Sequence, residues 1–362
     1  MKAAVLREVG QPLSIEQVEI GKPGPHEVLI RTAAAGVCHS DLHFIEGKYP
    51  APTPAILGHE SAGVVEQVGH EVTTVKPGDH VITCLSVFCG HCEDCLSGHM
   101  SLCRSPEVRP APGTGTMRLS QGGARINQFF NLSSFAEQML IHEHACVAIR
   151  DDMPLDRAAL IGCGVTTGVG AVIHTSKVKP GETVAVLGCG GVGLAAINGA
   201  AIAGAGRIIA IDTSASKANM VRAFGATDFI DASQGDPVAQ VMELTKGGVH
   251  HSFEAIGLGK TAEQAFNMLR RGGTANIIGM IPPGQGVTLM GAAFLAEKRI
   301  QGSAMGSNRF PIDMPRFVDF YLSGKLKLDE MISRRIKLED INEAFAEMKT
   351  GQIARSVIVF DA

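Results

Sequence analysis

The sequence predicts an α/β protein in which a doubly wound parallel sheet is inserted into a mostly β domain. Thr183–Leu187 is a β-branched run, followed by a glycine-rich turn and an Ala- and Leu-rich stretch, and strand and helix patterns then alternate to about residue 280. Residues 1–82 instead alternate short apolar strands with Gly/Pro turns. We therefore expect a first domain over 1–164, an inserted dinucleotide-binding domain over 165–304, and a return to the first domain over 305–362.

The glycine-rich turn is the centre of this prediction. Gly188, Gly190 and Gly193 form G-x-G-x-x-G, in which the glycines allow a tight turn, close approach of the backbone to a pyrophosphate, and close packing of helix on strand. The next strand, Arg207 to Ile211, ends at Asp212, which can accept hydrogen bonds from ribose hydroxyls. A chain with 43 glycines can show this motif by chance. Here strand, glycines, helix and acid stand at the expected offsets, which favours a dinucleotide site.

The remaining elements follow in order. In the first domain we expect antiparallel strands in 1–82, a long loop after Cys103, a strand near Glu137 to Ile141 and a helix from Leu155 to Gly170. Beyond Asp212 we expect helices ending at Gly225 and spanning 238–248 and 261–273, with strands at 228–233, 249–257 and 274–280. Helices at 315–324 and 341–351 precede a closing strand at 354–362, which we expect to rejoin the first domain.

A four-cysteine loop gives the most specific metal signal. Cys89, Cys92, Cys95 and Cys103 follow C-x2-C-x2-C-x7-C, and four soft thiolates in one short loop suit a closed tetrahedral zinc site. The first spacings also match an iron–sulfur run, which would place its fourth cysteine after three residues and follow it with proline. Here Arg104 follows the fourth cysteine. The pattern therefore favours structural zinc over a cluster or metal-free thiols.

Composition excludes other classes of function. The net charge of −4 gives no electrostatic footprint for nucleic acid. The longest apolar stretches are interrupted before they reach the length of a bilayer span, and the N-terminus MKAAVLREVG lacks the apolar core of a signal peptide. Nine cysteines, an odd number with four at metal-ligand spacing, indicate reduced thiols and a cytoplasmic protein.

Several motifs together resemble one family. Gly58-His59-Glu60 is followed by Gly63, Gly69 and Val72, and these accompany Cys38, the four-cysteine loop and the glycine motif. Through these motifs, the chain resembles over its whole length the zinc-dependent alcohol dehydrogenases of the medium-chain dehydrogenase/reductase superfamily. The order and spacing of the motifs resemble the long-loop branch, which includes the liver-type and class III enzymes. The resemblance implies a GroES-like catalytic domain, an inserted Rossmann domain with a cleft between them, NAD, and two zinc ions per chain.

The resemblance also implies a catalytic centre. Cys38, His59 and Cys163 match the three ligands of the catalytic zinc, a Cys₂His set with one position open for the substrate oxygen. Zinc there acts as a Lewis acid on the alkoxide, which transfers a hydride to the nicotinamide ring. Asp41 matches a carboxylate that orients His59, and Glu60 matches an acid near the metal.

Proton transfer and cofactor contacts follow from the same resemblance. Ser40 matches the hydroxyl that contacts the alcohol, and His43 matches the histidine that releases the proton to solvent. The implied cofactor contacts, besides the three motif glycines and Asp212, are His39, Thr167, Gly191, Val192, Lys217 and Arg355. Of these, His39 lies on the phosphate side, Lys217 at the adenosine end, and Arg355 at the pyrophosphate.

The implied substrate pocket is uncharged. Its wall comprises Ser40, Tyr49, Leu85, Val108, Phe129, Phe130 and Met280. An uncharged wall favours primary alcohols with an aromatic, allylic or medium-chain group as substrates. Together with the implied NAD, it predicts the interconversion of these alcohols and their aldehydes. Asp212 predicts a preference for NAD over NADP, since an anion repels the phosphate on the ribose of NADP.

Two alternatives remain open at this point. A formaldehyde dehydrogenase acting on a thiol adduct needs a cation for the thiol's carboxylate just after the cysteine loop, where this chain has Glu107. A non-enzymatic dinucleotide-binding structural protein, of the quinone-reductase or crystallin type, lacks the zinc ligands that are all present here. The resemblance favours a homodimer formed through Rossmann edge strands, with a homotetramer as the alternative, and neither nucleic acid nor membrane as a partner.

Overall fold

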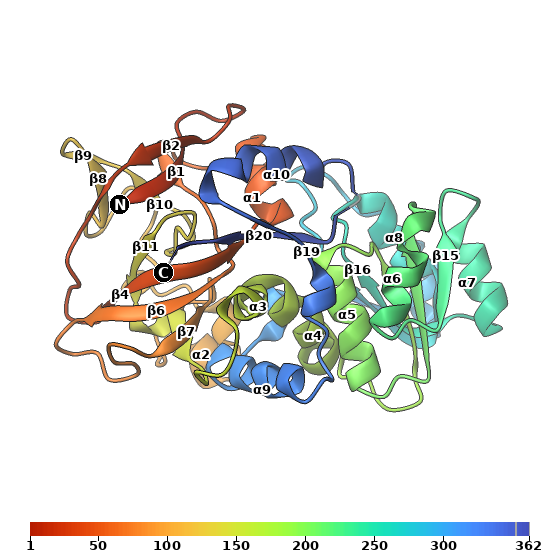
Figure 1. Ribbon diagram of the computed structural model, residues 1–362. Helices are drawn as coiled ribbons and strands as arrows, with labels where there is room; N and C mark the ends of the chain where they lie inside the picture. The colour runs from red at the N-terminus through yellow and green to blue at the C-terminus, as the bar shows by residue number, and fades with distance from the viewer. Residues whose placement is uncertain (352, 362) are drawn as a thin grey trace. The chain divides into compact units, whose positions relative to one another are not determined.

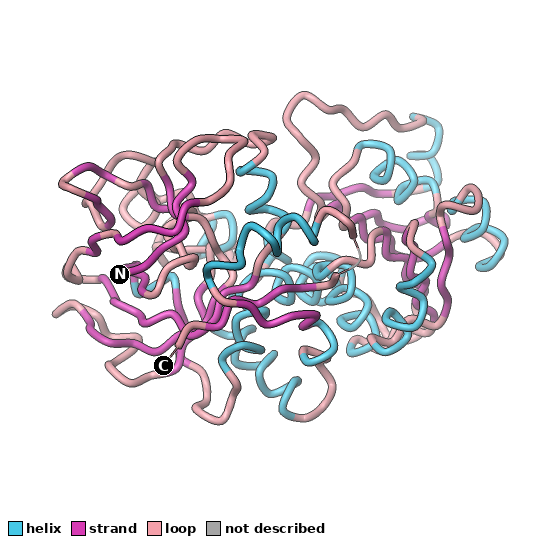
Figure 2. Tube along the Cα trace, turned by 45° about the horizontal axis from the view of Figure 1, so that its top comes forward, coloured by secondary structure: helices cyan, strands magenta, loops and turns pink. Residues whose placement is uncertain are grey.

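The computed structural model describes residues 1–351 and 353–361, which form two compact units (Figure 1). The first unit contains residues 1–163, residues 309–324 and the chain from Ile332 onward; the second contains residues 164–308 and 325–331. Both ends of the chain therefore belong to the first unit (Figure 2). Asn198 binds residues 325–331 within the second unit, donating to Lys325 O and accepting from Lys327 N. We expected all of residues 305–362 to belong to the first domain. In the structure, residues 305–308 and 325–331 of this range belong to the second unit.

The described residues of the first unit form three sheets, and most of the strand pairs in them are antiparallel. A four-stranded sheet has the order β10-β5-β1-β2, and a small one the order β3-β8-β9. The largest has the order β12-β7-β6-β4-β20-β19, with β11 also paired to β4. Their bounds are β1 (Lys2–Leu6), β2 (Ser14–Gln17), β3 (Glu19–Ile20), β4 (Glu27–Gly36), β5 (Ala55–Ile56), β6 (Ser61–Val68), β7 (His80–Thr83), β8 (Leu119–Gln121), β9 (Ala124–Arg125), β10 (Asn127–Gln128), β11 (Gln138–His142), β12 (Cys146–Ala148), β19 (Ile332–Ile336) and β20 (Arg355–Val359).

The closing strand rejoins the first unit as expected. β20 pairs antiparallel with β4, with Val357 opposite Gly36, and lies beside it in Figure 1. The last residue of the expected strand, Ala362, lies outside the described residues. Strand β4 sits in the middle of the large sheet, and most of its side chains are buried, as the Val- and Ala-rich sequence of a central strand requires.

Short helices complete the first unit. They are α1 (His39–Ile45), α2 (Glu93–Leu96), α3 (Leu155–Leu160), α9 (Phe310–Leu322) and α10 (Ile341–Met348). Helix α9 begins five residues before the expected start at Pro315, which lies inside it. Pro315 is the sixth residue of this helix, so the N–H that it lacks removes one helical hydrogen bond, to the carbonyl of Pro311.

The second unit has one parallel sheet of six strands in the order β15-β14-β13-β16-β17-β18. This is the doubly wound order, with its switch point between β13 and β16. The strands are β13 (Thr183–Leu187), β14 (Arg207–Asp212), β15 (Asp228–Asp231), β16 (Val249–Glu254), β17 (Leu269–Ile277) and β18 (Arg299–Gly302), and the helices between them include α5 (Gly191–Ile202), α6 (Ala218–Ala223), α7 (Pro237–Thr245) and α8 (Gly259–Asn267).

The sequence assigned one segment of this unit wrongly. The expected helix over 261–273 ends at Asn267, and Leu269, Arg270 and Arg271 begin strand β17. Leu269 is fully buried opposite Val249 of β16, whereas the two arginines are exposed. Pairing with a neighbouring strand therefore overrides the helical preference of Leu and Arg at this point.

The expected helix around Cys163 is longer than the sequence indicated. One helical stretch runs over Leu155–Ser176, including π-helical turns at Ile161–Val165 and Ala171–Ser176. Its length and apolar composition would suffice to cross a membrane, contrary to the expectation that no apolar stretch reaches a span. However, 83% of its most apolar window is buried inside the protein, as in the core helix of a globular domain.

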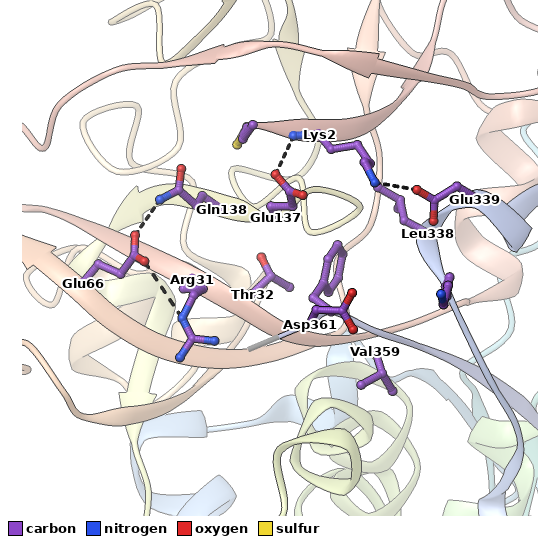
Figure 3. Close-up of a pocket in the computed structure, with 13 residues that line it drawn as sticks. Lys2, Arg31, Thr32, Glu66, Glu137, Gln138, Leu338, Glu339, Val359 and Asp361 are labelled. Carbon is purple, nitrogen blue, oxygen red and sulfur yellow. Dashed lines mark hydrogen bonds and ion pairs between the residues drawn. The ribbon is translucent and has the colours of Figure 1, made fainter.

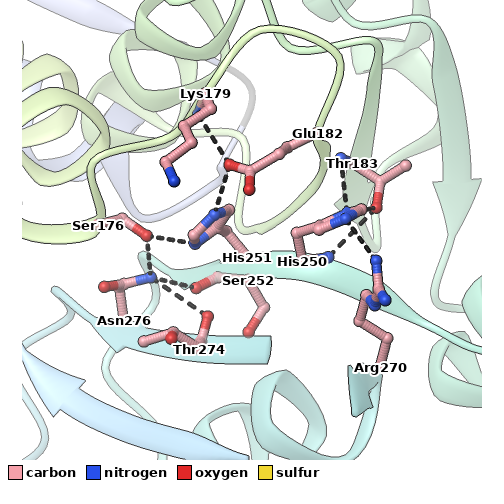
Figure 4. A network of polar contacts seen from close by, with 10 residues as sticks. All are labelled: Ser176, Lys179, Glu182, Thr183, His250, His251, Ser252, Arg270, Thr274 and Asn276. Atoms are coloured by element: carbon pink, nitrogen blue, oxygen red, sulfur yellow. Dashed lines mark hydrogen bonds and ion pairs between the residues drawn. The ribbon is translucent and has the colours of Figure 1, made fainter. Parts of the chain in front are cut away.

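Polar contacts fasten the sheet of the second unit at the ends where β13 and β16 begin (Figure 4). His251 lies 2.6 Å from Ser176 Oγ through Nδ1 and 2.9 Å from Glu182 Oε2 through Nε2. His250 lies 2.8 Å from Thr183 Oγ1 and 2.6 Å from Arg270 Nη1. Adjacent histidines on one strand thus connect the segments on either side of it.

A cavity of about 430 Å³ in the first unit contains none of the expected site residues. Its wall includes the side chains of Lys2, Arg31, Glu66, Glu137 and Glu339 (Figure 3), which pair mostly with one another. The chemistry predicted from the sequence therefore lies elsewhere in this unit.

Candidate active site and metal centres

Cys38, His59 and Cys163 come together in the first unit. Cys38 immediately precedes α1, His59 lies between β5 and β6, and Cys163 lies on the π-helical turn at Ile161–Val165. All three side chains are buried, and one ligand atom from each lies within 4.8 Å of the others. π-Helical turns are rare and occur often at functional sites. The three residues that the resemblance nominated thus form one cluster.

The donor chemistry of this cluster fits a zinc ion. A hydrogen bond from Cys163, together with Arg355 and His59, holds the pKa of the Cys38 thiol well below its ordinary value. The same contact and burial raise the pKa of Cys163, because two thiols this close cannot both ionise readily. A divalent cation stabilises both thiolates at once, and two thiolates with one imidazole are a zinc ligand set.

Asp41 fixes the orientation of His59. Asp41 Oδ1 lies 2.9 Å from His59 Nδ1, and the carboxylate also accepts the backbone N–H groups of Gly58 and Cys38. Burial by itself would lower the pKa of His59, but the Asp41 carboxylate and Cys38 raise it well above its ordinary value. A carboxylate on Nδ1 leaves Nε2 for a metal, which is the usual arrangement of a ligating histidine. The predicted orienting role therefore has the required geometry.

The sequence did not predict that Glu60 forms an ion pair with Arg355. Arg355 of β20 donates from Nε to Glu60 Oε1 and from Nη2 to Glu60 Oε2, both at 3.1 Å. Arg355 Nη2 also lies 3.5 Å from Cys38 Sγ. Glu60 is 0% exposed and Arg355 only 3% exposed. The pair thus lies against the cysteine–histidine cluster, and the expected contact of Arg355 with the pyrophosphate remains a prediction.

Helix α1 carries the residues expected to move the proton. Ser40 and His43 stand three positions apart and therefore share one face of the helix, and both are half-buried, whereas His39 is exposed. His43 Nδ1 is buried and has no hydrogen-bond partner among the described residues. Burial, aided by Lys48, lowers the pKa of His43. The relay through these residues remains a prediction.

The four cysteines of the loop form a second cluster in the first unit. Their sulfur atoms lie within 4.8 Å of one another, with 3.9 Å between the sulfurs of Cys89 and Cys95 and between those of Cys92 and Cys103. Although burial opposes it, backbone N–H groups of His91 and Cys92 lower the pKa of Cys89 to about 6, whereas burial raises that of Cys95 to about 12. Four thiols without an open position fit a structural zinc site.

The glycine motif has the geometry that dinucleotide binding requires. Gly188, at φ +90°, follows β13, and a Cβ on Gly193 would lie 1.8 Å from Gly188 O. By contrast, a Cβ on Gly190 would meet no atom within 4 Å, so its backbone faces open space at the start of α5. The first turn of α5, with Gly191 and Val192, therefore offers free N–H groups to a phosphate. Thr167 is buried in α4 (Thr166–Gly170), with its hydroxyl 3.3 Å from Met305 Sδ.

Asp212 lies at the end of β14, next to this turn. Its carboxylate accepts from Cys189 N at 2.8 Å and Ser214 N at 3.0 Å, and Lys217 Nζ lies 2.9 Å from Oδ2. Lys217, expected at the adenosine end of the cofactor, is thus paired with the acid expected to bind the ribose. The anion is held in place by these three donors.

Comparisons with known proteins agree with this geometry. The family description "Alcohol dehydrogenase GroES-like domain" matches residues 24–151, and "Zinc-binding dehydrogenase" matches residues 191–323. The chain is 40% identical to a probable S-(hydroxymethyl)glutathione dehydrogenase 1 of Schizosaccharomyces pombe, over 99% of this chain and 96% of that protein. It is 40% identical to a class-3 alcohol dehydrogenase of Pisum sativum, over 99% of this chain and 97% of that protein. The chain belongs to the zinc-dependent alcohol dehydrogenase family.

Solved structures agree with this assignment. The chain is similar to an alcohol dehydrogenase zinc-binding domain protein from Burkholderia ambifaria, with a TM-score of 0.95 and 35% identity over 100% of this chain and 99% of that one. It is also similar to benzyl alcohol dehydrogenase from Acinetobacter calcoaceticus, with a TM-score of 0.94 and 32% identity over 99% of both chains. The predicted GroES-like and Rossmann folds are confirmed.

Zinc alcohol dehydrogenases use NAD and zinc, and the two clusters provide a catalytic and a structural zinc site. The non-enzymatic alternative is thereby set aside, since every zinc ligand expected of the enzymes is present in its cluster. Zinc fits both donor sets on their chemistry alone.

Aromatic rings pack around His59 in this alcohol dehydrogenase. The ring centroids of Phe129 and Phe130 lie 6.0 and 5.8 Å from that of His59, both edge to face. Phe44 meets the same two rings at 4.8 and 5.5 Å, and Tyr49 lies 5.7 Å from Phe44. The family resemblance predicted Tyr49, Phe129 and Phe130 as pocket residues but did not include Phe44. The position of Phe44 next to His43 in the sequence could have indicated it.

The other expected wall residues lie in different places. Val108 is 4% exposed in a core cluster that includes cysteines of the zinc loop, and Leu85 packs against this cluster. Met280 belongs to the second unit. A substrate contact for these three residues stays a prediction.

Proposed function

We propose that this zinc alcohol dehydrogenase is NAD-linked and interconverts primary aromatic, allylic or medium-chain alcohols and their aldehydes. The observation that supports this substrate class most directly is the set of uncharged rings of Phe44, Phe129 and Phe130 packed beside His59. An apolar wall favours a substrate that buries carbon next to the reacting oxygen.

The chain's own residues have distinct tasks in this reaction. Bound zinc would supply a Lewis acid at Cys38, His59 and Cys163, and NAD would supply the hydride acceptor. Asp41 keeps His59 in one tautomer and orientation. Ser40 accepts the proton of the alcohol as it passes on its own hydroxyl proton, and His43 accepts a proton and releases it toward solvent. Burial lowers the pKa of His43, which favours the neutral imidazole that can accept this proton.

The same wall argues against polar substrates. A carboxylate or a sugar hydroxyl placed against these rings would lose hydrogen bonds, at a cost of about 1 to 3 kcal/mol for each buried group. Each added methylene, in contrast, contributes roughly 0.8 kcal/mol. Hydroxy acids and polyols are therefore poor substrates in this proposal.

A second candidate is the oxidation of a thiol adduct of formaldehyde, because relatives at about 40% identity are named S-(hydroxymethyl)glutathione dehydrogenase and class-3 alcohol dehydrogenase. The charges after the cysteine loop argue against it. Glu107 is exposed and lies 3.0 Å from His91 Nε2. Arg109, the nearest following cation, donates to the carbonyls of Cys103 and Leu85, and its guanidinium is engaged there.

The assembly proposed is a cytoplasmic homodimer formed through the edge of the second unit's sheet. Strand β18 is an edge strand with mostly exposed residues, and near it Met290 is 74% and Leu295 88% exposed. An exposed strand edge and exposed large apolar side chains such as these are typical of an interface between subunits. Free thiols at all nine cysteines fit a reducing compartment.

Steady-state kinetics with NAD test the substrate class. We expect kcat/KM to rise by well over tenfold from ethanol to hexanol or benzyl alcohol, with little turnover of sorbitol. Equal efficiency with ethanol, sorbitol and benzyl alcohol would contradict the proposal.

Sedimentation analysis of the zinc-loaded enzyme tests the dimer against a monomer or tetramer.

A further inference from the structure

The turn that carries Phe129 and Phe130 has an unusual backbone. Phe130, Asn131 and Ser133 have φ angles of 48°, 60° and 64°, in the left-handed region. Asparagine tolerates that region, but phenylalanine and serine do so only at a cost. Three such residues within four positions persist only where surrounding contacts impose them, and strain of this kind gathers at functional sites.

The side chain of Ser133 provides those contacts. Its Oγ accepts the backbone N–H of Phe129 at 2.8 Å and donates to the carbonyl of Ile56 at 2.7 Å. Ser133 is 2% exposed, so both bonds are shielded from water. One hydroxyl thus closes the turn on itself and ties it to the segment that leads into His59.

Neighbouring backbone bonds join the same two segments. Ser134 N donates to Gly58 O at 3.0 Å, and Phe135 N donates to Leu57 O at 3.1 Å. Gly58 has φ +90°, and a Cβ there would lie 2.6 Å from Phe135 N. The segment before His59 and the aromatic turn therefore pack backbone against backbone. A side chain at position 58 would push the two segments apart.

This arrangement fixes two rings against one metal ligand. Phe129 and Phe130 lie 4.1 Å apart between centroids, and each meets His59 edge to face. A flat substrate ring beside them gains aromatic contacts that a puckered ring of equal size lacks.

We propose that Ser133 is a positioning residue that, through the left-handed turn, holds Phe129 and Phe130 as a rigid wall and so sets a preference for planar alcohols. This inference rests on the proposed function and narrows it from apolar alcohols to aromatic and conjugated ones. Ser133 acts through the two rings and does not itself contact the substrate.

The test compares benzyl alcohol with cyclohexylmethanol, which have six-membered rings that differ in flatness. The ratio of their kcat/KM values is measured on one zinc-loaded sample, so any inactive fraction cancels. We expect wild type to favour benzyl alcohol by about tenfold or more. Ser133→Ala should reduce the ratio to near one, whereas Ser134→Ala should leave it unchanged, because Ser134 Oγ is buried without a hydrogen-bond partner among the described residues.

Two further variants keep the test decisive. Ser133→Gly removes the same hydroxyl while tolerating the positive φ, and it replaces Ser133→Ala if that variant does not fold. Phe130→Leu should lower the ratio as Ser133→Ala does, and combining the two changes should add little further loss.

Each contrary outcome has its own meaning. An unchanged ratio in both Ser133 variants, or full additivity with Phe130→Leu, overturns the positioning role. A wild type that oxidises both alcohols equally well also overturns it but leaves the proposed function standing. A wild type that oxidises neither of these alcohols nor hexanol or an allylic alcohol, while oxidising other substrates, overturns the proposed function itself.

Discussion

Arg355 holds both carboxylate oxygens of Glu60 at 3.1 Å, although 295 positions separate the two residues in the sequence. Strand β20 delivers the arginine by pairing with β4 near the end of the chain. Burial opposes a charged guanidinium, but Cys38 and Glu60 raise the pKa of Arg355 further above its already high ordinary value. The closing strand therefore contributes directly to the electrostatics of the catalytic cluster.

The first prediction concerns this pair. Arg355→Met removes the guanidinium that donates to both oxygens of the buried Glu60 carboxylate, and should lower the free energy of unfolding by about 3 to 5 kcal/mol. Adding Glu60→Gln should recover part of that loss. Arg335→Met, which breaks an exposed ion pair with Asp156, should cost less than about 1 kcal/mol. Urea denaturation of the zinc-loaded proteins measures all three. If both arginine variants lost the same free energy of unfolding, burial of the Arg355–Glu60 pair would not increase its contribution to stability.

The second prediction separates the two metal sites. Cys163→Ala should fold, retain one zinc ion per chain and lose turnover, because the four-cysteine cluster is untouched. Cys95→Ala should instead lower the melting temperature, because a thiolate cage that helps to fold its loop loses a ligand. Zinc content and thermal melts decide between them. Normal turnover in Cys163→Ala, or the same loss of fold in both variants, would contradict the assignment.

The third prediction is a preference for NAD over NADP. Removing the anion in Asp212→Gly also frees Lys217 to meet a ribose phosphate, so the ratio of Kd values for NADPH and NADH should fall by about tenfold or more. Asp231→Gly is a matched control, because Asp231 ends the neighbouring strand β15 and also accepts an N–H two residues later. Fluorescence titration with each reduced cofactor measures the ratio. A wild type that binds both cofactors equally would contradict the claim.

The fourth prediction concerns acid stability of the first unit. Burial and the nearby His144 lower the pKa of His142 from 6.5 to about 4. The unfolded chain therefore binds more protons than the folded one between these values, so stability decreases as the pH falls through this window, by up to about 1.4 kcal/mol per unit. Protonation would also break the bond from His144 N to His142 Nδ1.

His142→Asn tests this effect. Asparagine can still accept the His144 N–H, but it does not titrate. The melting temperature of the variant should fall less steeply than that of wild type between pH 6.5 and 5. Identical slopes would assign the acid sensitivity to other groups.

Local sequence signals predicted the parts of this protein whose chemistry lies within one segment. The four-cysteine spacing and the strand-glycine-helix unit ending at Asp212 needed no distant contact, and both have the expected geometry. The catalytic ligands are dispersed along the chain, and only the family resemblance joined Cys38, His59 and Cys163. Strand β17 was misassigned at Leu269 because pairing with β16 decides its conformation.

Contacts that depend on folding could not be predicted in this way. The Arg355–Glu60 pair requires β20 to return beside β4, and no periodicity encodes that meeting. Ser133 has an unremarkable residue type, and its importance appears only through its φ angle and its bond to Ile56. Side chains whose role depends on a distant partner are therefore found from the structure.

The fifth prediction distinguishes the two candidate substrates. Glu107 places a negative charge where the glutathione carboxylate of a thiol adduct would lie by the family resemblance, and Arg109 is engaged by two carbonyls. Wild type should therefore oxidise benzyl alcohol with a much higher kcat/KM than S-(hydroxymethyl)glutathione. Glu107→Arg should raise kcat/KM for the adduct by about tenfold or more, since an unfavourable charge contact becomes a favourable one. Glu93→Arg, at an exposed position within the adjoining four-cysteine loop, should leave it unchanged. Should wild type prefer the adduct, or both arginine variants respond alike, Glu107 is not a determinant of substrate choice and the thiol-adduct activity becomes the better assignment.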